Sequence, residues 1–291
     1  MKQTVIVYSH FVEISRKSDR LCIETPKIKS ELPLPNIDGI LVFGKAKLTS
    51  EVISLCMKHN VPILLLTQYG TLKGLILPPP QSEATSKRIK QFTLYYFKKI
   101  EIARLIVQRK CDEVEASFNL ELSKSKEALK KANDLNQILG VEGSVSKAMF
   151  QSFEGLLSGT GFKFEERTYY PPKDEVNTLL SFVYTLGYNL ALSLILLKGF
   201  DPFISFLHVK RGSHASFASD LVEIIRPQLT LFCAKLLQDG TVSKGDFLRE
   251  QGSYLLKKQA VSRVLERFNP LKEELLVPMK LFLSDLESFE V

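Results

Sequence analysis

The pattern of hydrophobic and polar positions changes character near residue 78. Before that point, short β-branched or apolar runs alternate with turn residues, a pattern typical of strands. In one stretch, over 48–59, apolar residues instead recur at helical spacing, and Thr49 or Ser50 can cap the helix that this predicts. We expect strands over residues 4–8, 11–14, 20–24, 39–43, 61–66 and 72–77.

Three consecutive prolines and small polar residues follow, and they predict a semi-rigid linker over 78–85. Beyond the linker the helical period dominates. The fold class is therefore expected to be α+β with two domains: a small N-terminal β-rich domain over 1–77 and a larger all-α C-terminal domain over 86–291. Its helices are expected over 87–110, 113–133, 144–158, 174–198, 214–226, 228–238 and 253–268.

The first of these helices has a distinct apolar face and many basic residues. The apolar face consists of Ile89, Phe92, Tyr96, Ile100, Ala103 and Val107. Eight basic residues, from Lys87 to Lys110, make the helix strongly cationic. Such a charge run is either a solvated face or a track for nucleic acid, and the sequence leaves both interpretations open.

Cysteine and histidine usage excludes two kinds of site. The four cysteines are widely spaced, which fits neither a disulfide framework nor a CxxC zinc site and favours a reducing, cytoplasmic location. Four histidines are too few for an extensive histidine-based metal site. The net charge of +7 hints only weakly at polyanionic partners.

One segment is apolar enough to raise the question of a membrane. Residues 176–197 carry no charge and are long enough to span a bilayer. However, one face of the predicted helix carries a polar stripe, formed by Asn177, Ser181, Tyr184 and Tyr188. Such a stripe suits a buried helix that lines a polar site. We therefore expect a core helix and no membrane association. The N-terminus lacks the long apolar region and the cleavage site of a signal peptide.

Residues that could carry chemistry concentrate between Gly199 and Pro227. Asp220 and Glu223 stand three residues apart in a helical segment, so their carboxylates share a face among apolar neighbours. Two like charges held near a core favour either a shared proton or a bound cation. His208 ends an apolar run, where it is either a hydrogen-bonded core histidine or a ligand.

A further carboxylate, Glu142, lies between Gly140 and Gly143 just before a predicted helix. It is either a simple charge–dipole residue or, because glycines permit close backbone approach, part of a site. Carboxylates plus one imidazole suit Mg²⁺ or Mn²⁺ better than structural zinc. Such an ion would support phosphodiester chemistry, with phosphates held by the nearby Lys210, Arg211 and His214.

At these residues the sequence resembles the CRISPR-associated integrase family, the spacer-acquisition nucleases of CRISPR adaptation. The N-terminal Phe43-Gly44, Val61-Pro62 and Tyr69-Gly70 also fit, so the resemblance covers nearly the whole chain. Four motifs in the right order carry it: Gly140 to Gly143, Asn177 to Leu180 with Tyr184, Gly199 to Pro202 with Leu207-His208, and Ser216 with Asp220 to Glu223 and Arg226-Pro227.

The resemblance implies a β-rich domain that forms a homodimer and a helical domain with a divalent-metal site. By motif match, Glu142, His208 and Glu223 would bind Mg²⁺ or Mn²⁺, with Asp220 an essential neighbour. The implied reaction is insertion of short DNA duplexes into a CRISPR array, in which a 3′-hydroxyl attacks a phosphodiester. The implied partners are double-stranded and branched DNA and the small CRISPR adaptation protein, which joins two such dimers.

The roles of three further side chains and two rival functions stay open. Tyr184 and Tyr188 either line the site or are satisfied core hydroxyls, and Arg167 either contacts DNA or is a surface residue. We count Tyr188 and Arg167 among the candidate DNA-binding residues. One rival function is a non-catalytic DNA-binding scaffold of the same fold. The other is a general metal-dependent nuclease unrelated to CRISPR.

Overall fold

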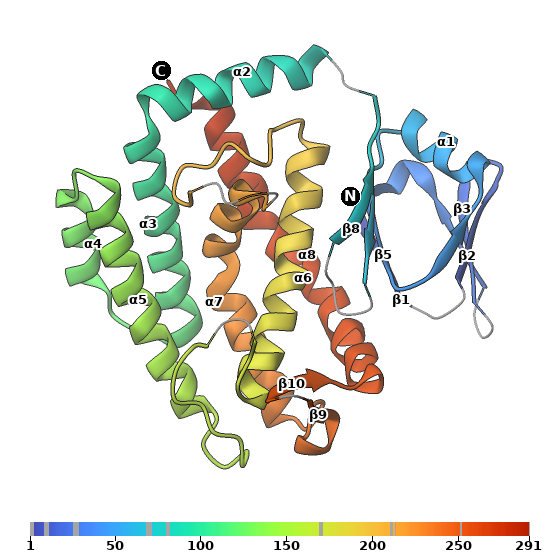
Figure 1. Ribbon diagram of the computed structural model, residues 1–291. Coiled ribbons are helices and arrows are strands. Elements are labelled where there is room, and N and C mark those ends of the chain that lie inside the picture. Colours follow the sequence, from blue (N-terminus) through green and yellow to red (C-terminus); the bar gives the residue numbers. More distant parts are fainter. Residues whose placement is uncertain are drawn as a thin grey trace. The chain divides into compact units, whose positions relative to one another are not determined.

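The computed structural model shows strands in the N-terminal part of the chain and helices in most of the remainder (Figure 1). It describes residues 3–8, 12–25, 29–67, 72–79, 82–168, 171–209, 212, 214–250 and 252–290. The predicted turn at Tyr69-Gly70 and the predicted phosphate contacts Lys210 and Arg211 lie outside these residues.

The chain forms two compact units, whose bounds differ from the predicted domain bounds. One unit comprises Met1–Ile89 and Leu192–Asp201, and the other comprises Lys90–Ala191 and Pro202–Val291. Helix α2 (Ser82–Phe97) begins inside the predicted linker, since the polar residues after the prolines already adopt helical geometry. Helices α2 and α6 (Glu175–Leu197) each contribute residues to both units.

The first unit contains two four-stranded sheets with the orders β1-β5-β7-β8 and β4-β3-β2-β6. In the first sheet β5 pairs in parallel with β1 and β7, and β8 is antiparallel to β7. In the second, β2, β3 and β4 are antiparallel and β6 joins β2 in parallel. The strands are β1 (Gln3–Tyr8), β2 (Val12–Lys17), β3 (Arg20–Glu24), β4 (Lys29–Pro33), β5 (Ile37–Phe43), β6 (Ala46–Leu48), β7 (Ile63–Leu66) and β8 (Leu72–Ile76).

Each predicted strand of this unit is confirmed, within a few residues at its ends. The central strand β5 is buried at all seven positions, which explains its mostly apolar sequence; the one acidic residue, Asp38, accepts a 2.8 Å bond from the Thr4 hydroxyl. Helix α1 (Ser50–Lys58) is also confirmed, and Thr49 caps it by accepting a 3.3 Å hydrogen bond from the backbone N–H of Val52. Strands β4 and β6 were not predicted, because one is mostly polar and the other has three residues.

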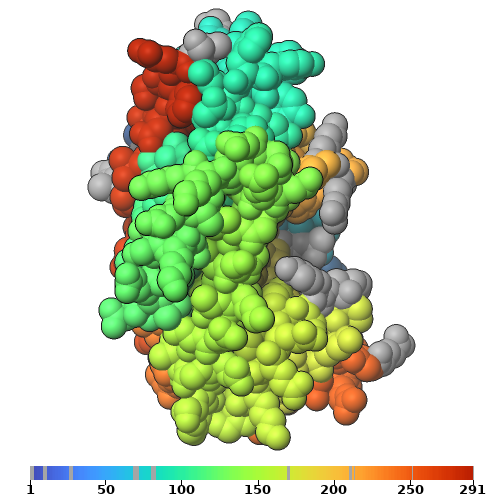
Figure 2. Space-filling model, turned by 90° about the vertical axis from the view of Figure 1, so that its left-hand side faces the viewer, coloured from blue at the N-terminus to red at the C-terminus, as the bar shows by residue number. Residues whose placement is uncertain are grey.

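The second unit is mostly helical. Helices α4 and α5, coloured green, cover much of the face shown in Figure 2. A two-stranded antiparallel hairpin pairs β9 (Phe247–Glu250) with β10 (Ser253–Leu256). The predicted helix 253–268 is therefore wrong over residues 253–256, and the helix there begins at Lys258 and extends to Ser288. The helices wholly within this unit are α3 (Lys99–Phe118), α4 (Ser123–Lys131), α5 (Leu135–Leu156), α7 (Ser216–Gln238) and α8 (Lys258–Ser288).

Several helix boundaries correct the prediction. The predicted helix 87–110 is divided at Lys98, and Asn119 ends α3 in a left-handed conformation with φ 52°. Helix α5 begins nine residues earlier than predicted, because Asp134 caps it by accepting a 2.9 Å bond from the N–H of Gln137. Pro227 lies within α7 instead of dividing it, although proline removes one backbone donor.

The predicted apolar face of the first helix is buried only along α3. Ala103 and Val107 are fully buried there. On α2, by contrast, Ile89, Phe92 and Tyr96 are 63%, 51% and 67% exposed. The prediction of a helix is therefore confirmed, but the predicted apolar face is wrong for α2. The buried face of α2 instead contains Gln91 and Leu94.

Helix α6 is long and apolar enough to cross a membrane by composition, and 78% of its most apolar window is buried within the protein. The side chains of the polar stripe form internal hydrogen bonds, such as the 2.7 Å bond that the Asn177 amide Nδ2 donates to Oδ2 of Asp174. These features are those of a core helix. Cys22, Cys56, Cys111 and Cys233 are all buried and free, as expected without disulfides.

Candidate active site

Three helices and one loop of the second unit bring charged side chains together. We call the resulting group the acid–base cluster. Its members are Lys110 from α3, Glu142 and Ser146 from α5, His208 from the loop before α7, and Asp220, Glu223 and Arg226 from α7. The four predicted catalytic residues, Glu142, His208, Asp220 and Glu223, all belong to it.

Glu142 lies in the third turn of α5, where its carboxylate meets two donors. Its Oε1 accepts a 2.7 Å hydrogen bond from the Ser146 hydroxyl and a bond from the Lys110 ammonium. A helix dipole acts mainly within the first turn. The interpretation of Glu142 as a simple charge–dipole residue is therefore wrong, because that interpretation placed the helix start after it.

Asp220 is fully buried and fixes the loop that carries His208. Its Oδ2 accepts bonds of 2.6 and 3.1 Å from the backbone N–H groups of Phe206 and Leu207. Its Oδ1 accepts 2.9 and 2.8 Å bonds from the backbone N–H and the Nδ1 of His208. A carboxylate that receives four hydrogen bonds holds both the backbone and the ring of His208 in one orientation.

The ring of His208 is one-third exposed and has one nitrogen directed toward the cluster. Because Nδ1 donates to Asp220, the neutral ring presents Nε2 as an acceptor, 3.7 Å from Oε1 of Glu223. Burial lowers the pKa of His208, but the hydrogen bond and charge of Asp220 and the charge of Glu223 outweigh it. The net effect is a raised pKa.

Glu223 is buried and contacts two cationic side chains. Arg226 donates from Nε to Oε2 at 2.9 Å and from Nη2 to Oε1, and Lys110 donates to Oε2 at 2.6 Å. Burial alone would raise the pKa of Glu223, yet the charges of Arg226, Lys110 and His208 lower it to about 2. Glu223 is thus stabilised by Lys110 and Arg226, whereas Asp220 is stabilised by backbone N–H groups and His208.

Tyr184 supports Arg226 from α6. The Arg226 guanidinium lies 4.9 Å from the centre of the Tyr184 ring, a cation–π contact. The Tyr184 hydroxyl is 2.6 Å from the hydroxyl of Thr230, and burial raises its pKa to about 12. Tyr184 is thus a satisfied core hydroxyl whose ring supports the cluster.

Sequence reasoning missed the two cations of the cluster. Lys110 was counted with the basic residues of the first helix, yet its side chain is fully buried. It lies three residues after the buried Val107, so continuing the apolar face by one step would have found it. Arg226 lies three residues after Glu223 on α7, a spacing at which opposite charges pair.

Two predicted DNA-binding residues form a pair beside the start of α7. The rings of Tyr188 and His214 are stacked, with centroids 4.9 Å apart and planes at 16°. The Tyr188 hydroxyl accepts a 2.9 Å bond from the N–H of Ala215, and Nε2 of the exposed His214 is 2.7 Å from the hydroxyl of Ser219. Their role in binding DNA stays a prediction.

Arg167, also predicted to bind DNA, contacts helix α6. It donates 2.8 and 3.0 Å bonds to Asn177 and Ser181, and its guanidinium lies 5.5 Å from the centre of the Tyr184 ring. The side chain thus connects the segment before α6 to the polar stripe of that helix.

The donor set of the cluster fits a divalent cation. Over the part of the chain that the structure describes, no three His, Cys, Asp or Glu side chains form a ready metal site. Nevertheless, Glu142 and Glu223 both bond to one Nζ atom, so a cation fits between them. Two carboxylates and an imidazole nitrogen are ligands that Mg²⁺ and Mn²⁺ accept.

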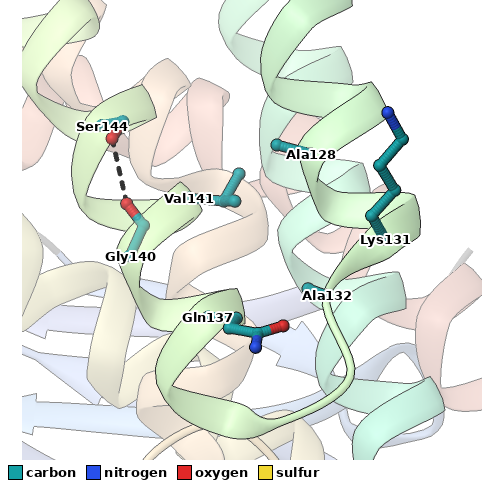
Figure 3. Close-up of a pocket in the computed structure, with 7 residues that line it drawn as sticks. All are labelled: Ala128, Lys131, Ala132, Gln137, Gly140, Val141 and Ser144. Carbon is teal, nitrogen blue, oxygen red and sulfur yellow. Dashed lines mark hydrogen bonds between the residues drawn. The ribbon is translucent and has the colours of Figure 1, made fainter.

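A separate pocket of about 450 Å³ lies between α4 and α5 (Figure 3). It is open and mainly apolar, and the Ser144 hydroxyl that lines it donates a 3.0 Å bond to the carbonyl of Gly140. No member of the acid–base cluster lines it, although Gly140 and Ser144 are near Glu142 in sequence. The lining residues are Ala128, Lys131, Ala132, Gln137, Gly140, Val141 and Ser144.

Comparison with known proteins gives relatives that match most of the chain. The CRISPR-associated endonuclease Cas1 of Nanoarchaeum equitans is 30% identical over 275 residues, covering 87% of this chain and 82% of that protein. The CRISPR-associated endonuclease Cas1 of Thermotoga maritima is 28% identical over 265 residues, covering 84% and 82%.

Solved structures share the fold. A Cas1 protein from Thermotoga maritima matches with a TM-score of 0.82 and 23% identity over 100% of this chain and 98% of that one. A casposase bound to its integration product matches with a TM-score of 0.78 and 23% identity over 99% and 91%. The family model described as CRISPR associated protein Cas1 matches residues 5–270. The chain therefore belongs to the Cas1 family, whose curated relatives here are named endonucleases.

Proposed function

We propose that this chain is a metal-dependent DNA endonuclease and integrase that inserts short duplexes into a CRISPR array. The observation that carries the proposal is the convergence of Glu142 and Glu223 on one cation, with Nε2 of His208 directed at Glu223. A protein that only binds DNA has no use for three acidic side chains grouped inside a helical core, where each costs free energy to desolvate.

The residues of the cluster have distinct roles in this proposal. Glu142, His208 and Glu223 hold Mg²⁺ or Mn²⁺, and Asp220 orients His208 through the bond to Nδ1. When bound, the ion stabilises charge on the phosphodiester and lowers the pKa of the attacking oxygen. Arg226 orients Glu223 through its two-pronged contact.

The reaction is a transesterification that conserves phosphodiester bonds. The 3′-oxygen of the incoming duplex forms a bond to phosphorus, and the bond from phosphorus to the 3′-oxygen of the array strand breaks. The attacking hydroxyl gives up its proton to solvent, and the departing oxygen takes one. Because one ester replaces another, no external energy source is required.

DNA and protein partners are proposed from chemistry and from relatives. Double-stranded and branched DNA is bound at its phosphate backbone or adjacent bases by five side chains, those of Lys210, Arg211, His214, Arg167 and Tyr188. Solved relatives of the same fold include a casposase bound to an integration product, a Cas1–DNA complex and a Cas6-RT-Cas1–Cas2 complex. We propose that this chain, acting in the cytoplasm, forms a homodimer through its β-rich part and assembles with the small CRISPR adaptation protein.

His208→Ala tests the proposal in a strand-transfer assay with Mn²⁺, the purified partner protein and a leader–repeat substrate. We expect loss of metal-dependent strand transfer, while folding and duplex binding stay intact. His59→Ala, which changes a histidine at the end of α1, is the matched control and should retain activity. Unchanged integration by His208→Ala would overturn the assignment.

The rival functions give different results in the same assay. A DNA-binding scaffold predicts duplex binding that weakens with salt but is indifferent to EDTA, and no strand transfer. A general nuclease predicts equal cleavage of linear and branched DNA. We expect instead that EDTA abolishes strand transfer and that branched substrates are preferred.

A further inference from the structure

Lys110 occupies the position between the two carboxylates of the acid–base cluster. Its side chain is fully buried, and its Nζ donates to Glu142, to Glu223 at 2.6 Å and to the hydroxyl of Ser146 at 2.7 Å. An ammonium group has three protons to donate, so these three acceptors satisfy it completely. The lysine is thus held in the interior by specific partners.

Without a cation at this position, the carboxylates of Glu142 and Glu223 would repel each other in a poorly solvated site. Lys110 offsets that repulsion. Arg226 does not substitute for it, because the described contacts of Arg226 with the cluster carboxylates are with Glu223. Lys110 is therefore the side chain that joins the carboxylate of α5 to that of α7.

The same position is the one that a divalent ion bridging Glu142 and Glu223 would occupy. Oε2 of Glu223 already accepts from both Lys110 and Arg226, and Oε1 accepts from Arg226. The cluster contains three carboxylates and two cationic side chains, so its net charge is −1 when His208 is neutral. A divalent ion added beside both cations would leave +1 in a largely buried site, which is unfavourable.

We propose that the Lys110 ammonium holds the metal position in the metal-free protein and is displaced when Mg²⁺ or Mn²⁺ binds. Lys110 thereby keeps the ligands together while lowering the affinity of the site for the ion. This inference rests on the proposed function, since it concerns the same metal site. In these terms Lys110 is a positioning residue that acts through Glu142 and Glu223.

Mn²⁺ binding measured by electron paramagnetic resonance of the free ion, without DNA, tests the proposal. We expect Lys110→Met to bind Mn²⁺ at least tenfold more tightly than the wild type, whereas Lys110→Arg, which keeps the positive charge, should stay weak. The melting temperature of Lys110→Met should be lower without metal and should rise more on Mn²⁺ addition. Equal or weaker Mn²⁺ binding by Lys110→Met would overturn the proposal.

The chain offers a matched control in Lys126, whose ammonium also bridges two carboxylates. It contacts Asp112 at 2.7 Å and Glu115, but its side chain is 24% exposed and lies outside the cluster. Lys126→Met should leave Mn²⁺ affinity unchanged. A tenfold gain in this variant as well would show a general charge effect and would also overturn the proposal.

A measurement on the wild type keeps the proposal testable if Lys110→Met does not fold. The ¹⁵N signal of the Lys110 ammonium, assigned by its absence in Lys110→Arg, should shift or vanish on Mg²⁺ titration, while the Lys126 signal stays in place. A Lys110 signal that is unchanged at saturating Mg²⁺ contradicts displacement.

Failure of this inference and failure of the proposed function give different results. If the wild type requires Mn²⁺ for strand transfer but Lys110→Met binds the ion no more tightly, only the role of Lys110 is wrong. If the wild type binds no Mn²⁺ and its activity is indifferent to EDTA, both proposals are wrong.

Discussion

Nδ1 of His208 lies 2.8 Å from Oδ1 of Asp220, and the same carboxylate accepts three backbone N–H groups from residues 206–208. This side chain therefore fixes the rotation of the imidazole ring and helps to set the path of the loop. Ser205 and Gln91 also hold the loop, through bonds to the carbonyls of His208 and Ile204. The direction of Nε2 toward Glu223 follows from Asp220.

Asp220→Asn should reduce both the stability of the protein and its strand-transfer activity. The amide presents a donor to groups that are themselves donors, so we expect destabilisation by about 2–4 kcal/mol. Strand transfer should fall by about 10–100-fold, as for other residues that orient a metal ligand. Urea unfolding and the strand-transfer assay measure the two quantities. Asp239→Asn, at an exposed aspartate, is the control, and equal losses in both variants would contradict a specific role.

Arg226→Lys tests whether the guanidinium matters beyond its charge. Lysine cannot contact both oxygens of Glu223 in the same way, and it loses the planar contact with the Tyr184 ring. We expect the free energy of unfolding to fall by about 1–3 kcal/mol. Arg249→Lys is the matched control, because Arg249 also lies over a tyrosine, Tyr254, but is exposed. Chemical denaturation of both variants should show a loss only for Arg226.

Two helical glycines should respond in opposite ways to alanine. At Gly187 in α6 a Cβ atom would lie 2.5 Å from Cδ1 of the buried Leu229 in α7, so overpacking should cost about 1–3 kcal/mol. At Gly143 in α5 a Cβ atom would have no neighbour within 4 Å, and alanine should stabilise the protein by up to about 1 kcal/mol. Thermal unfolding compares the two, and a stabilised Gly187→Ala would mean that α6 and α7 are less tightly packed than described.

Asp246 should contribute stability that depends on pH. Burial raises the pKa of Asp246, but hydrogen bonds from Arg263 and Ser243 outweigh it, so the pKa is below its usual range. Its contribution is therefore complete above the ordinary value of about 3.9 and is lost as the pH falls through the lower folded-state pKa. Asp246→Asn should reduce the fall in unfolding free energy between pH 7 and pH 3 by at most about 1.3 kcal/mol, the most that a carboxylate with an ordinary pKa of about 3.9 can contribute over this range. Urea unfolding at both values measures this, and the exposed Asp19→Asn should behave as the wild type does.

The sequence predicted those parts of the fold whose signal is local. Strand β5 is apolar at most positions because both of its faces are buried, and Thr49 caps α1 from the position that the pattern indicated. Strand β4 could not be found in this way, because it begins with three polar residues and ends in proline, and its pairing with β3 supplies the extended conformation. The prediction that a helix ends before Pro227 is wrong for a similar reason. Burial of residues on both sides of Pro227 keeps α7 continuous.

In the candidate site, too, the residues with a local sequence signal were predicted, and the cations that pair with them were missed. His208, Asp220 and Glu223 lie within one short stretch, so their spacing and apolar neighbours indicated a site. The burial of Lys110, however, depends on partners 32 and 113 residues away in sequence. The spacing from Val107 places Lys110 on the buried face of α3, but no pattern within α3 identifies the carboxylates that pair with it.

The acid–base cluster draws its side chains from positions as far apart as Lys110 and Arg226. A ribosome must therefore translate most of the chain before any copy of the protein has a complete site. A copy whose synthesis stops before α7, or from which a protease has removed α7, lacks all three of Asp220, Glu223 and Arg226. An enzyme proposed to cut and join the genome of its own host would thus be inactive in its unfinished and damaged forms without any dedicated inhibitor.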